Sequence, residues 1–187
     1  EAITGQDLVE WQLRVASGEP LPLKQDELRI HGHAIEARIC AENPDNNFLP
    51  ATGTLHVYAQ PACTTFERAA HGVRIDAGVR EGDTISPFYD SMVAKLIVHG
   101  DTREQALARL DTALAQTHIV GLATNVQFLR HVTTSAAFAQ AKLDTALIQR
   151  ETDVLFKQEK VGLRMATAAM VAEMLVSEAS LAAQADA

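Results

Sequence analysis

Arg74 is the residue of this chain whose setting most directly suggests chemistry. It stands between Val73 and Ile75 in a short apolar stretch. Because successive side chains of a strand point to opposite faces of a sheet, the guanidinium lies on the face away from its apolar neighbours. This makes it a fixed cation beside a core, able to hold an anionic ligand. A structural interpretation is also open, in which Arg74 pairs with Glu36 or Asp76.

Glu36 and Arg38 are two further charged candidates. They stand two residues apart in a stretch of alternating apolar and polar side chains, which puts them on one face of a strand. They can join an ion network beside Arg74 and so support a site. They can as well form a solvated pair, because exposed ion pairs contribute little to stability.

Asp90 follows Tyr89 at a turn and is counted as a third supporting residue. Capping of the following backbone by the Asp90 carboxylate is the simpler interpretation. Lys95 is expected to extend its ammonium to solvent or to an acid. His31 and His33 have the spacing of two metal ligands on one strand, but no third ligand accompanies them, so no metal site is predicted.

The composition excludes several classes of protein. The net charge of -8 and the pI near 5.3 argue against general nucleic-acid binding, which needs a basic face. Cys40 and Cys63 are far apart without Cys-x-x-Cys spacing, so reduced thiols are expected and not a disulfide or a zinc site. No apolar run reaches membrane-spanning length, and no signal segment stands at the start. The opening on Glu1 suggests a piece of a longer protein.

Two helix starts carry the residues of a capping box. In the first, the Thr4 hydroxyl can accept from an early helix amide, and the Asp7 side chain can accept from the backbone amide of Thr4 in return. This predicts a helix over about 7–17. In the second, an Asp-Thr-Arg-Glu start precedes leucines at helical spacing, which predicts a helix over about 101–116. The first helix has nothing nearby to cover its apolar stripe, so it should pack on other protein.

Later segments are also expected to be helical. Asn125, after Thr124, is expected to cap a helix that reaches about residue 131, and residues 136–140 form a short one. Residues 161–187 are rich in Ala, Met and Glu with loose periodicity. Such a segment forms a helix readily but has little apolar area to bury, so it is interpreted as a linker or arm that needs a partner.

Four stretches have strand character, and no helical pattern lies between any two of them. They cover residues 28–39, 55–58, 73–76 and 93–98. A bulge is expected near Gly32, residues 42–47 are expected to be loop throughout, and Ile119-Val120 predicts a short strand. The fold class is therefore α+β, with an antiparallel sheet flanked by helices.

Several motifs in one order carry a family resemblance over about residues 1–150. They lie at residues 1–10, 32–39, 48–50, 72–74, 89–92 with 95–96, and 121–125. Together they resemble the carboxy-terminal part of the biotin carboxylase of biotin-dependent carboxylases. Within that family, residues 8–14 and 46–50 most resemble the 3-methylcrotonyl-CoA carboxylase alpha subunits of leucine degradation, with the propionyl-, acetyl- and geranyl-CoA carboxylase alpha subunits close behind.

The resemblance implies an ATP-grasp ligase. In the family, ATP and two magnesium ions activate bicarbonate to carboxyphosphate, and the carboxyl group passes to N1 of biotin. Arg74 matches the family arginine that holds the ureido oxygen of biotin as negative charge builds there. An arginine suits this role because it stays charged at any working pH and its planar fork fixes the oxygen without giving up a proton.

The resemblance also divides the chain. Residues 1–27 would be the end of an ATP-grasp domain, 28–150 the biotin carboxylase C-terminal domain, and 151–187 a helical linker or arm. The implied partners are the N-terminal ATP-grasp part of the same subunit, which would bind ATP and Mg²⁺, a biotin carboxyl carrier domain, and a carboxyltransferase beta subunit. The implied compartment is the bacterial cytoplasm, or the mitochondrial matrix in a eukaryote.

This chain lacks a glycine-rich phosphate loop and the Ala-Met-Lys-Met signature that carries biotin. We therefore expect it to fold but to have no turnover alone. An alternative function is a non-catalytic assembly module, because in the family this lobe also carries contacts between paired subunits and can form a homo-oligomer. Arg103 matches a region near that pairing surface, whereas Val120 stands where the free-standing bacterial subunit has an acid.

Overall fold

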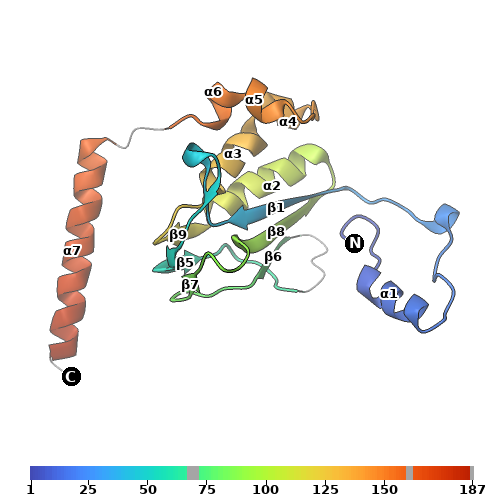
Figure 1. Ribbon diagram of the computed structural model, residues 1–187, viewed down its shortest axis with the longest axis horizontal. Coiled ribbons are helices and arrows are strands. Elements are labelled where there is room, and N and C mark those ends of the chain that lie inside the picture. Colours follow the sequence, from blue (N-terminus) through green and yellow to red (C-terminus); the bar gives the residue numbers. More distant parts are fainter. Residues whose placement is uncertain (67–71, 159–161, 186–187) are drawn as a thin grey trace. The chain divides into compact units, whose positions relative to one another are not determined.

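The computed structural model describes residues 1–66, 72–158 and 162–185. The chain divides into two compact units, residues 1–156 and residues 157–187, which are described separately. The first unit contains an antiparallel sheet with helices, so the predicted α+β class is confirmed (Figure 1).

The central sheet has three antiparallel strands in the order β1-β8-β6. Their bounds are His33–Cys40 for β1, Met92–Gly100 for β8 and Val73–Ala77 for β6. Arg74 lies opposite Ile97, which in turn lies opposite Glu36. The neighbouring row on the same face joins Asp76, Lys95 and Arg38. Charged side chains thus gather on one face of the sheet.

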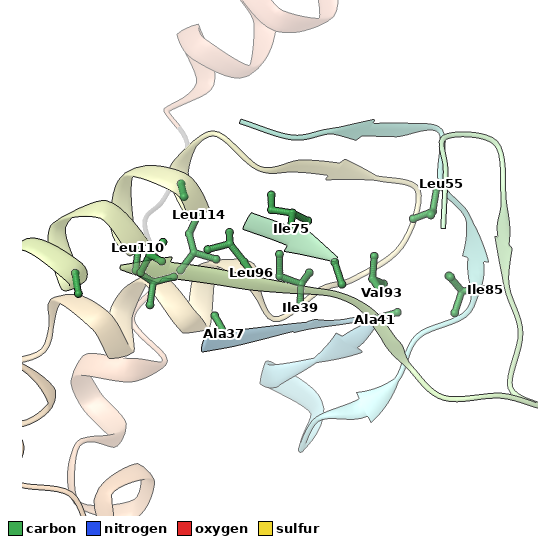
Figure 2. Packing of buried hydrophobic residues seen from close by; sticks show 14 residues of the cluster. Ala37, Ile39, Ala41, Leu55, Ile75, Ile85, Val93, Leu96, Leu110 and Leu114 are labelled. Atoms are coloured by element: carbon green, nitrogen blue, oxygen red, sulfur yellow. The ribbon is translucent and has the colours of Figure 1, made fainter. Parts of the chain in front are cut away.

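The opposite face of the sheet is the core. Helix α2, Arg103–Ala115, lies against it with five buried side chains, and Thr102 caps the helix by accepting from the amide of Gln105. Figure 2 shows the sheet residues of this core, which include Ala37, Ile39, Ile75, Val93 and Leu96, beside Leu110 and Leu114 of the helix. Each large aliphatic side chain buried there contributes about 1.5–3 kcal/mol. The core therefore fixes which face of β6 carries Arg74.

The strand predicted at residues 55–58 does not join this sheet. Leu55 is buried, but the strand near it is β5, Val57–Ala59, which pairs with β9, His118–Val120. Beside β6, Thr64 bridges to Arg74, and beside β1 the Asn125 side chain bonds the backbone of Arg38 and Cys40. The stretch at 55–58 pairs with β9 instead, so the prediction was wrong on this point.

Two further short ladders complete the strands. One pairs β2, Glu42–Asn43, with β3, Leu49–Pro50, and the other pairs β4, Gly53–Thr54, with β7, Thr84–Ile85. Segment 42–47 is therefore not loop throughout, since β2 is followed by a 3-10 turn over Pro44–Asn46. The short strand predicted at 119–120 is confirmed as part of β9.

The first helix, α1, spans Leu8–Ala16 and is capped differently from the prediction. The Asp7 carboxylate itself accepts from the amide of Glu10 at 2.9 Å. Thr4 lies one turn too early and accepts at 3.5 Å from the amide of Gln6. The predicted helix is confirmed, and its N-cap is Asp7.

The bulge of β1 also lies elsewhere than predicted. The register shifts between Ile39 and Cys40, and not at Gly32. Gly32 instead has a positive φ of 66° where the chain enters the strand, and a Cβ there would meet the carbonyl oxygen of Gly100. The glycine is required by this close approach and not by an extra residue in the ladder.

Four shorter helices follow β9 in the first unit. They are α3, Val126–Thr134, α4, Ala136–Ala139, α5, Leu147–Arg150, and α6, Thr152–Leu155. Phe128 of α3 packs between Phe48 and Phe156, with ring centroids 4.9 and 5.3 Å away. These aromatic contacts fasten the end of the first unit to its body.

The second unit is one helix, α7, spanning Leu163–Ala185. The helix predicted over residues 161–187 is thus confirmed for its described part. Its large apolar side chains, among them Met170 and Val176, are exposed by 68% and 71%. A search of the described residues for a helix long and apolar enough to cross a membrane finds none.

Candidate functional site

Arg74 is held on the charged face of the sheet by the acid two residues further along β6. Its Nε lies 3.0 and 2.9 Å from the two carboxylate oxygens of Asp76, and its Nη2 lies 2.6 Å from Oδ2. Residues i and i+2 share a face of a strand, so the sequence places the two side chains together. Paired, two-pronged bonds of this kind are among the strongest in proteins.

Asp76 makes a further bond to the backbone. Its Oδ1 accepts from the amide of Phe66 at 2.9 Å, and only 13% of its side chain is exposed. The hydrogen bond from Arg74 is the largest cause that holds the pKa of the Asp76 carboxyl below its usual value. The same bond raises the pKa of Arg74, so both groups are charged at neutral pH.

A cavity of about 240 Å³ opens beside Arg74. The start of the chain forms one side of it, with Glu1, Gln6 and Val9, and the sheet forms another, with Arg74 and Ile97. Phe66, Gly72, Val98 and His99 are among the other lining residues. Nη1 of Arg74 is 3.8 Å from Oε2 of Glu1, longer than a hydrogen bond. One edge of the guanidinium is therefore bound by Asp76, while Nη1 lies toward Glu1, which like Arg74 lines the cavity.

Glu36 and Arg38 share the charged face with Arg74 but form a loose pair. Arg38 Nε is 3.4 Å from Glu36 Oε1, and the two side chains are 67% and 42% exposed. Glu36 lies in the row of Arg74 and contributes to the raised pKa of that arginine. Lys95, opposite Asp76, contributes to the lowered pKa of that acid. These residues supply charge near the cavity, and the described lining residues include neither Glu36 nor Arg38.

Asp90 has the local role that its position in a turn predicts. Its Oδ1 accepts from the amide of Met92 at 2.9 Å. Tyr89 beside it is 89% exposed, and neither side chain belongs to the described cavity lining. A supporting role for Asp90 in the site stays a prediction.

The histidines and cysteines that the structure describes have no metal-binding arrangement. Among the described residues, no group of three or more His, Cys, Asp or Glu side chains is placed to hold a metal ion. His31 presents its carbonyl to the ring of His99, with Nε2 at 2.8 Å. Cys40 and Cys63 are free thiols, and burial is the largest cause that raises the pKa of Cys40. A raised pKa makes that thiol a poor nucleophile at neutral pH.

The cavity contains residues that the sequence did not single out. Phe66 and Glu1 line it, and Asp76 was weighed only as a structural partner of Arg74. An acid at i+2 from an arginine in a strand is a signal that can be read from the sequence. The approach of the first residues of the chain to β6 has no such signal.

The arrangement can bind an oxygen that carries or gains negative charge. The guanidinium is permanently charged, its Nε and Nη2 are fixed by Asp76, and Arg74 lines a cavity. A preorganised donor of this kind stabilises charge with little rearrangement when the charge appears.

Comparison with known proteins agrees with this fold. The model of the family described as biotin carboxylase C-terminal domain matches residues 36–150. The chain therefore belongs to the biotin carboxylase C-terminal domain family, and the resemblance found in the sequence is confirmed.

Similarity to curated relatives shows which members of the family this chain resembles. The mitochondrial methylcrotonoyl-CoA carboxylase subunit alpha of Oryza sativa is 50% identical over 156 residues, which is 83% of this chain and 20% of the relative. Biotin carboxylase 1 of Bacillus subtilis is 39% identical over 149 residues, 80% of this chain and 32% of the relative. The predicted likeness to the methylcrotonoyl-CoA carboxylase alpha subunits is confirmed, and the chain spans about a fifth of their length.

Solved structures share the fold. The biotin carboxylase domain of the Hydrogenobacter thermophilus 2-oxoglutarate carboxylase, a dimer in complex with MgADP and bicarbonate, matches with a TM-score of 0.76 and 35% identity over 84% of this chain and 33% of that one. The biotin carboxylase subunit of a pyruvate carboxylase matches with a TM-score of 0.76 and 34% identity, over 84% of this chain and 33% of that chain.

Proposed function

We propose that this chain forms one wall of the biotin site in the biotin carboxylase component of an acyl-CoA carboxylase, with 3-methylcrotonyl-CoA as the acyl substrate of the whole enzyme. In this proposal Arg74 binds the ureido oxygen of biotin. The observation that carries it is that Arg74 lines a cavity while Asp76 holds the Nε and Nη2 edge of its guanidinium. The family placement supports the reaction class.

The residues that line the cavity fit biotin, the group that carries the carboxyl in this family. Biotin supplies the nitrogen that accepts the carboxyl group, and its ureido oxygen becomes more negative as that nitrogen reacts. Arg74 offers a charged donor for this oxygen, and Ile97 and Val9 offer apolar surface beside it. The charge of Arg74 is secured by Asp76, since that bond raises the arginine pKa. The protein's part in this step is to orient the ring and to stabilise developing charge.

The remaining parts of the reaction are assigned to partners. The N-terminal ATP-grasp part of the same subunit would bind ATP and Mg²⁺, a carrier domain would deliver biotin, and a carboxyltransferase beta subunit would use the product. The compartment would be the bacterial cytoplasm or, as for the relatives named mitochondrial, the mitochondrial matrix. Residues 1–27 would end the ATP-grasp domain, 28–150 form the C-terminal domain and 151–187 form the arm. On this division the chain alone has no turnover, and ATP-dependent carboxylation of free biotin by the 187-residue chain would disprove that statement.

The test compares Arg74→Ala with wild type in the full-length subunit that contains this chain. Two rates are measured, the carboxylation of free biotin and the bicarbonate-dependent cleavage of ATP. The matched control is Arg130→Ala. Arg130 also pairs with an aspartate, Asp111, at 3.0 Å, but this pair joins α3 to α2 on the apolar side of the sheet.

Arg74→Ala is expected to lower biotin carboxylation by roughly 100-fold or more, the loss typical of removing one charge-stabilising donor. Cleavage of ATP is expected to stay within about threefold, because that step does not use Arg74. The Arg130→Ala control should keep both rates. Equal carboxylation by the Arg74→Ala and wild-type subunits would show that Arg74 is a structural arginine.

A second candidate function is assembly. It is favoured by the dimeric biotin carboxylase domain of the 2-oxoglutarate carboxylase, whose fold this chain shares. In this chain Arg103, the residue suggested for pairing, donates from Nη2 to the carbonyl of Phe138 at 2.7 Å and lies 5.3 Å from the centre of that ring. Arg103→Ala is therefore expected to loosen α4 as well as any pairing surface. Sedimentation of the full-length subunit before and after the change tests assembly, and an unchanged dimer would remove Arg103 from the pairing surface.

A further inference from the structure

Asp76 makes more contacts at the cavity than an ordinary partner of an ion pair. Oδ2 accepts from Nε and Nη2 of Arg74, and Oδ1 accepts from Nε of Arg74 and from the amide of Phe66. Arg74 and Phe66 both line the cavity. One carboxylate thus joins two parts of the cavity wall that come from different segments of the chain.

We propose that Asp76 is the positioning residue of this site: it holds the Nε and Nη2 edge of Arg74 and the backbone of Phe66, and so directs the Nη1 edge of Arg74 to the ligand. The proposal rests on the proposed function, because it takes the ligand oxygen to be the one that Arg74 binds. Asp76 acts through Arg74 and does not itself touch the ligand.

The physical need for such a residue follows from the arginine side chain. An arginine has many rotatable bonds, and its freedom must be removed if one edge of the guanidinium is to meet one oxygen. Asp76 has a short side chain on a paired strand, opposite Lys95, whose positive charge helps to keep the carboxylate ionised. A fixed acid that holds two of the guanidinium nitrogens leaves the third as the donor with a defined direction.

The contact to Phe66 supports the same interpretation. Phe66 has a positive φ of 54°, which is uncommon for a residue with a side chain. A conformation of this kind persists where surrounding contacts determine it. Here the amide of Phe66 is held by Asp76, and Thr64, two residues earlier, is bridged to Arg74. The carboxylate and the bridge together fix the segment that brings Phe66 to the cavity.

The Arg74–Asp76 pair is more buried and has a shorter contact than the Glu36–Arg38 pair on the same face. The Arg74 and Asp76 side chains are 27% and 13% exposed, with a shortest distance of 2.6 Å. The Glu36 and Arg38 side chains are 42% and 67% exposed and 3.4 Å apart. The first pair is built to a fixed geometry, whereas the second is solvated.

The test uses the full-length subunit that contains this chain, with free biotin as the probe. The variants are Asp76→Asn, which keeps the shape and removes the charge, Arg74→Ala, and the double variant. The control is Asp111→Asn, which removes the charge from a comparable pair with Arg130 on the other side of the sheet. Both biotin carboxylation and bicarbonate-dependent ATP cleavage are measured, together with thermal unfolding.

Asp76→Asn is expected to lower kcat/KM for biotin by about 10- to 100-fold, taking as a guide the loss caused by removing the hydrogen-bond partners that orient metal ligands. Cleavage of ATP should stay within about twofold, and Asp111→Asn should keep both rates. If Asp76 acts through Arg74, the double variant is no slower than Arg74→Ala alone. Losses that multiply in the double variant would overturn the proposal.

Two failures can be told apart. If Arg74→Ala abolishes carboxylation while Asp76→Asn keeps the wild-type rate, the positioning proposal fails and the proposed function stands. If Arg74→Ala keeps carboxylation, the proposed function fails and the positioning proposal with it. Should Asp76→Asn not fold, Asp76→Glu retains the carboxylate and is expected to keep ATP cleavage while losing part of the biotin rate. A folded Glu variant that loses both rates together would overturn the proposal, because that pattern marks general damage.

Discussion

Asn125 is expected to be one of the most sensitive polar residues of the fold. Its side chain is nearly buried, with 7% of the residue exposed. Its Oδ1 accepts from the amide of Cys40 at 2.9 Å, and its Nδ2 donates to the carbonyl of Arg38 at 3.0 Å. The amide of Asn125 also donates to the carbonyl of Cys40, so one residue at the start of α3 makes three hydrogen bonds to the end of β1.

The cost of Asn125→Ala can be worked from these bonds. The change leaves one backbone amide and one backbone carbonyl without their partners, and each unsatisfied group costs about 1–3 kcal/mol. Cys40 is only half-buried, so water can reach part of the edge and the lower values apply. We expect a loss of about 2–4 kcal/mol in the free energy of unfolding, which lowers Tm by roughly 5–15 °C for a chain of this size.

The assay is urea unfolding of the chain followed by circular dichroism, with thermal unfolding as a second measure. Asn46→Ala is the matched control, because Asn46 is exposed in a 3-10 turn, and its loss should stay within about 0.5 kcal/mol. Asn125→Asp keeps the acceptor for Cys40 but puts a carboxylate oxygen against the carbonyl of Arg38, so it too should destabilise. A loss below about 1 kcal/mol for Asn125→Ala would refute the reasoning.

Three further predictions follow from single contacts. Gly121→Ala should lower the free energy of unfolding by more than about 2 kcal/mol, because the φ of Gly121 is 122° and a Cβ there would meet the carbonyl oxygen of Thr54. Gly78→Ala is the control and should be tolerated, because a Cβ at Gly78 meets open space. Equal urea midpoints for the two variants would contradict this prediction. The folded pKa of Asp76 is lowered, so its contribution to stability is complete above the ordinary value of 3.8 and is lost as pH falls through the lower folded pKa. Wild type should therefore lose more stability than Asp76→Asn between pH 6 and about pH 2, and parallel curves would count against the pair. Cys40, with a raised pKa, should react with iodoacetamide slowly at pH 7.5 and faster above about pH 9, and rapid labelling at pH 7.5 would show a thiolate.

Helices and strands that depend on capping residues and on the spacing of apolar side chains could be predicted from local patterns in the sequence. Helix α2 could be predicted almost to the residue, because Thr102 supplies a cap and the leucines repeat at helical spacing. The strand that carries Arg74 could be predicted from alternation alone, and with it the face on which the arginine lies.

Features that depend on contacts between distant segments could not be predicted in the same way. Asn125 occupies the N-cap position of α3, as expected, but its side chain makes no capping bond and reaches Cys40, 85 residues earlier. Leu55 lies in a strand-like stretch, yet the strand that follows it pairs with the distant β9 and not with the central sheet. Hydrogen bonds of this kind are decided by which backbone groups remain unpaired in the folded chain.

The candidate site combines features that local sequence patterns predict with features that depend on contacts between distant segments. Arg74 was found from its place in a strand, and Asp76 was within reach of the same reasoning because it is two positions further along that strand. The cavity itself needs the first residues of the chain to approach β6, and Phe66 enters it through an uncommon backbone conformation. Neither fact is encoded in a short sequence pattern.

The most direct test of this account is the ratio of biotin carboxylation to bicarbonate-dependent ATP cleavage in the full-length subunit carrying Arg74→Ala. The account predicts that this ratio falls by about 100-fold relative to wild type, because only the biotin step uses the arginine. A ratio equal to that of wild type would contradict it and would make Arg74 a structural partner of Asp76.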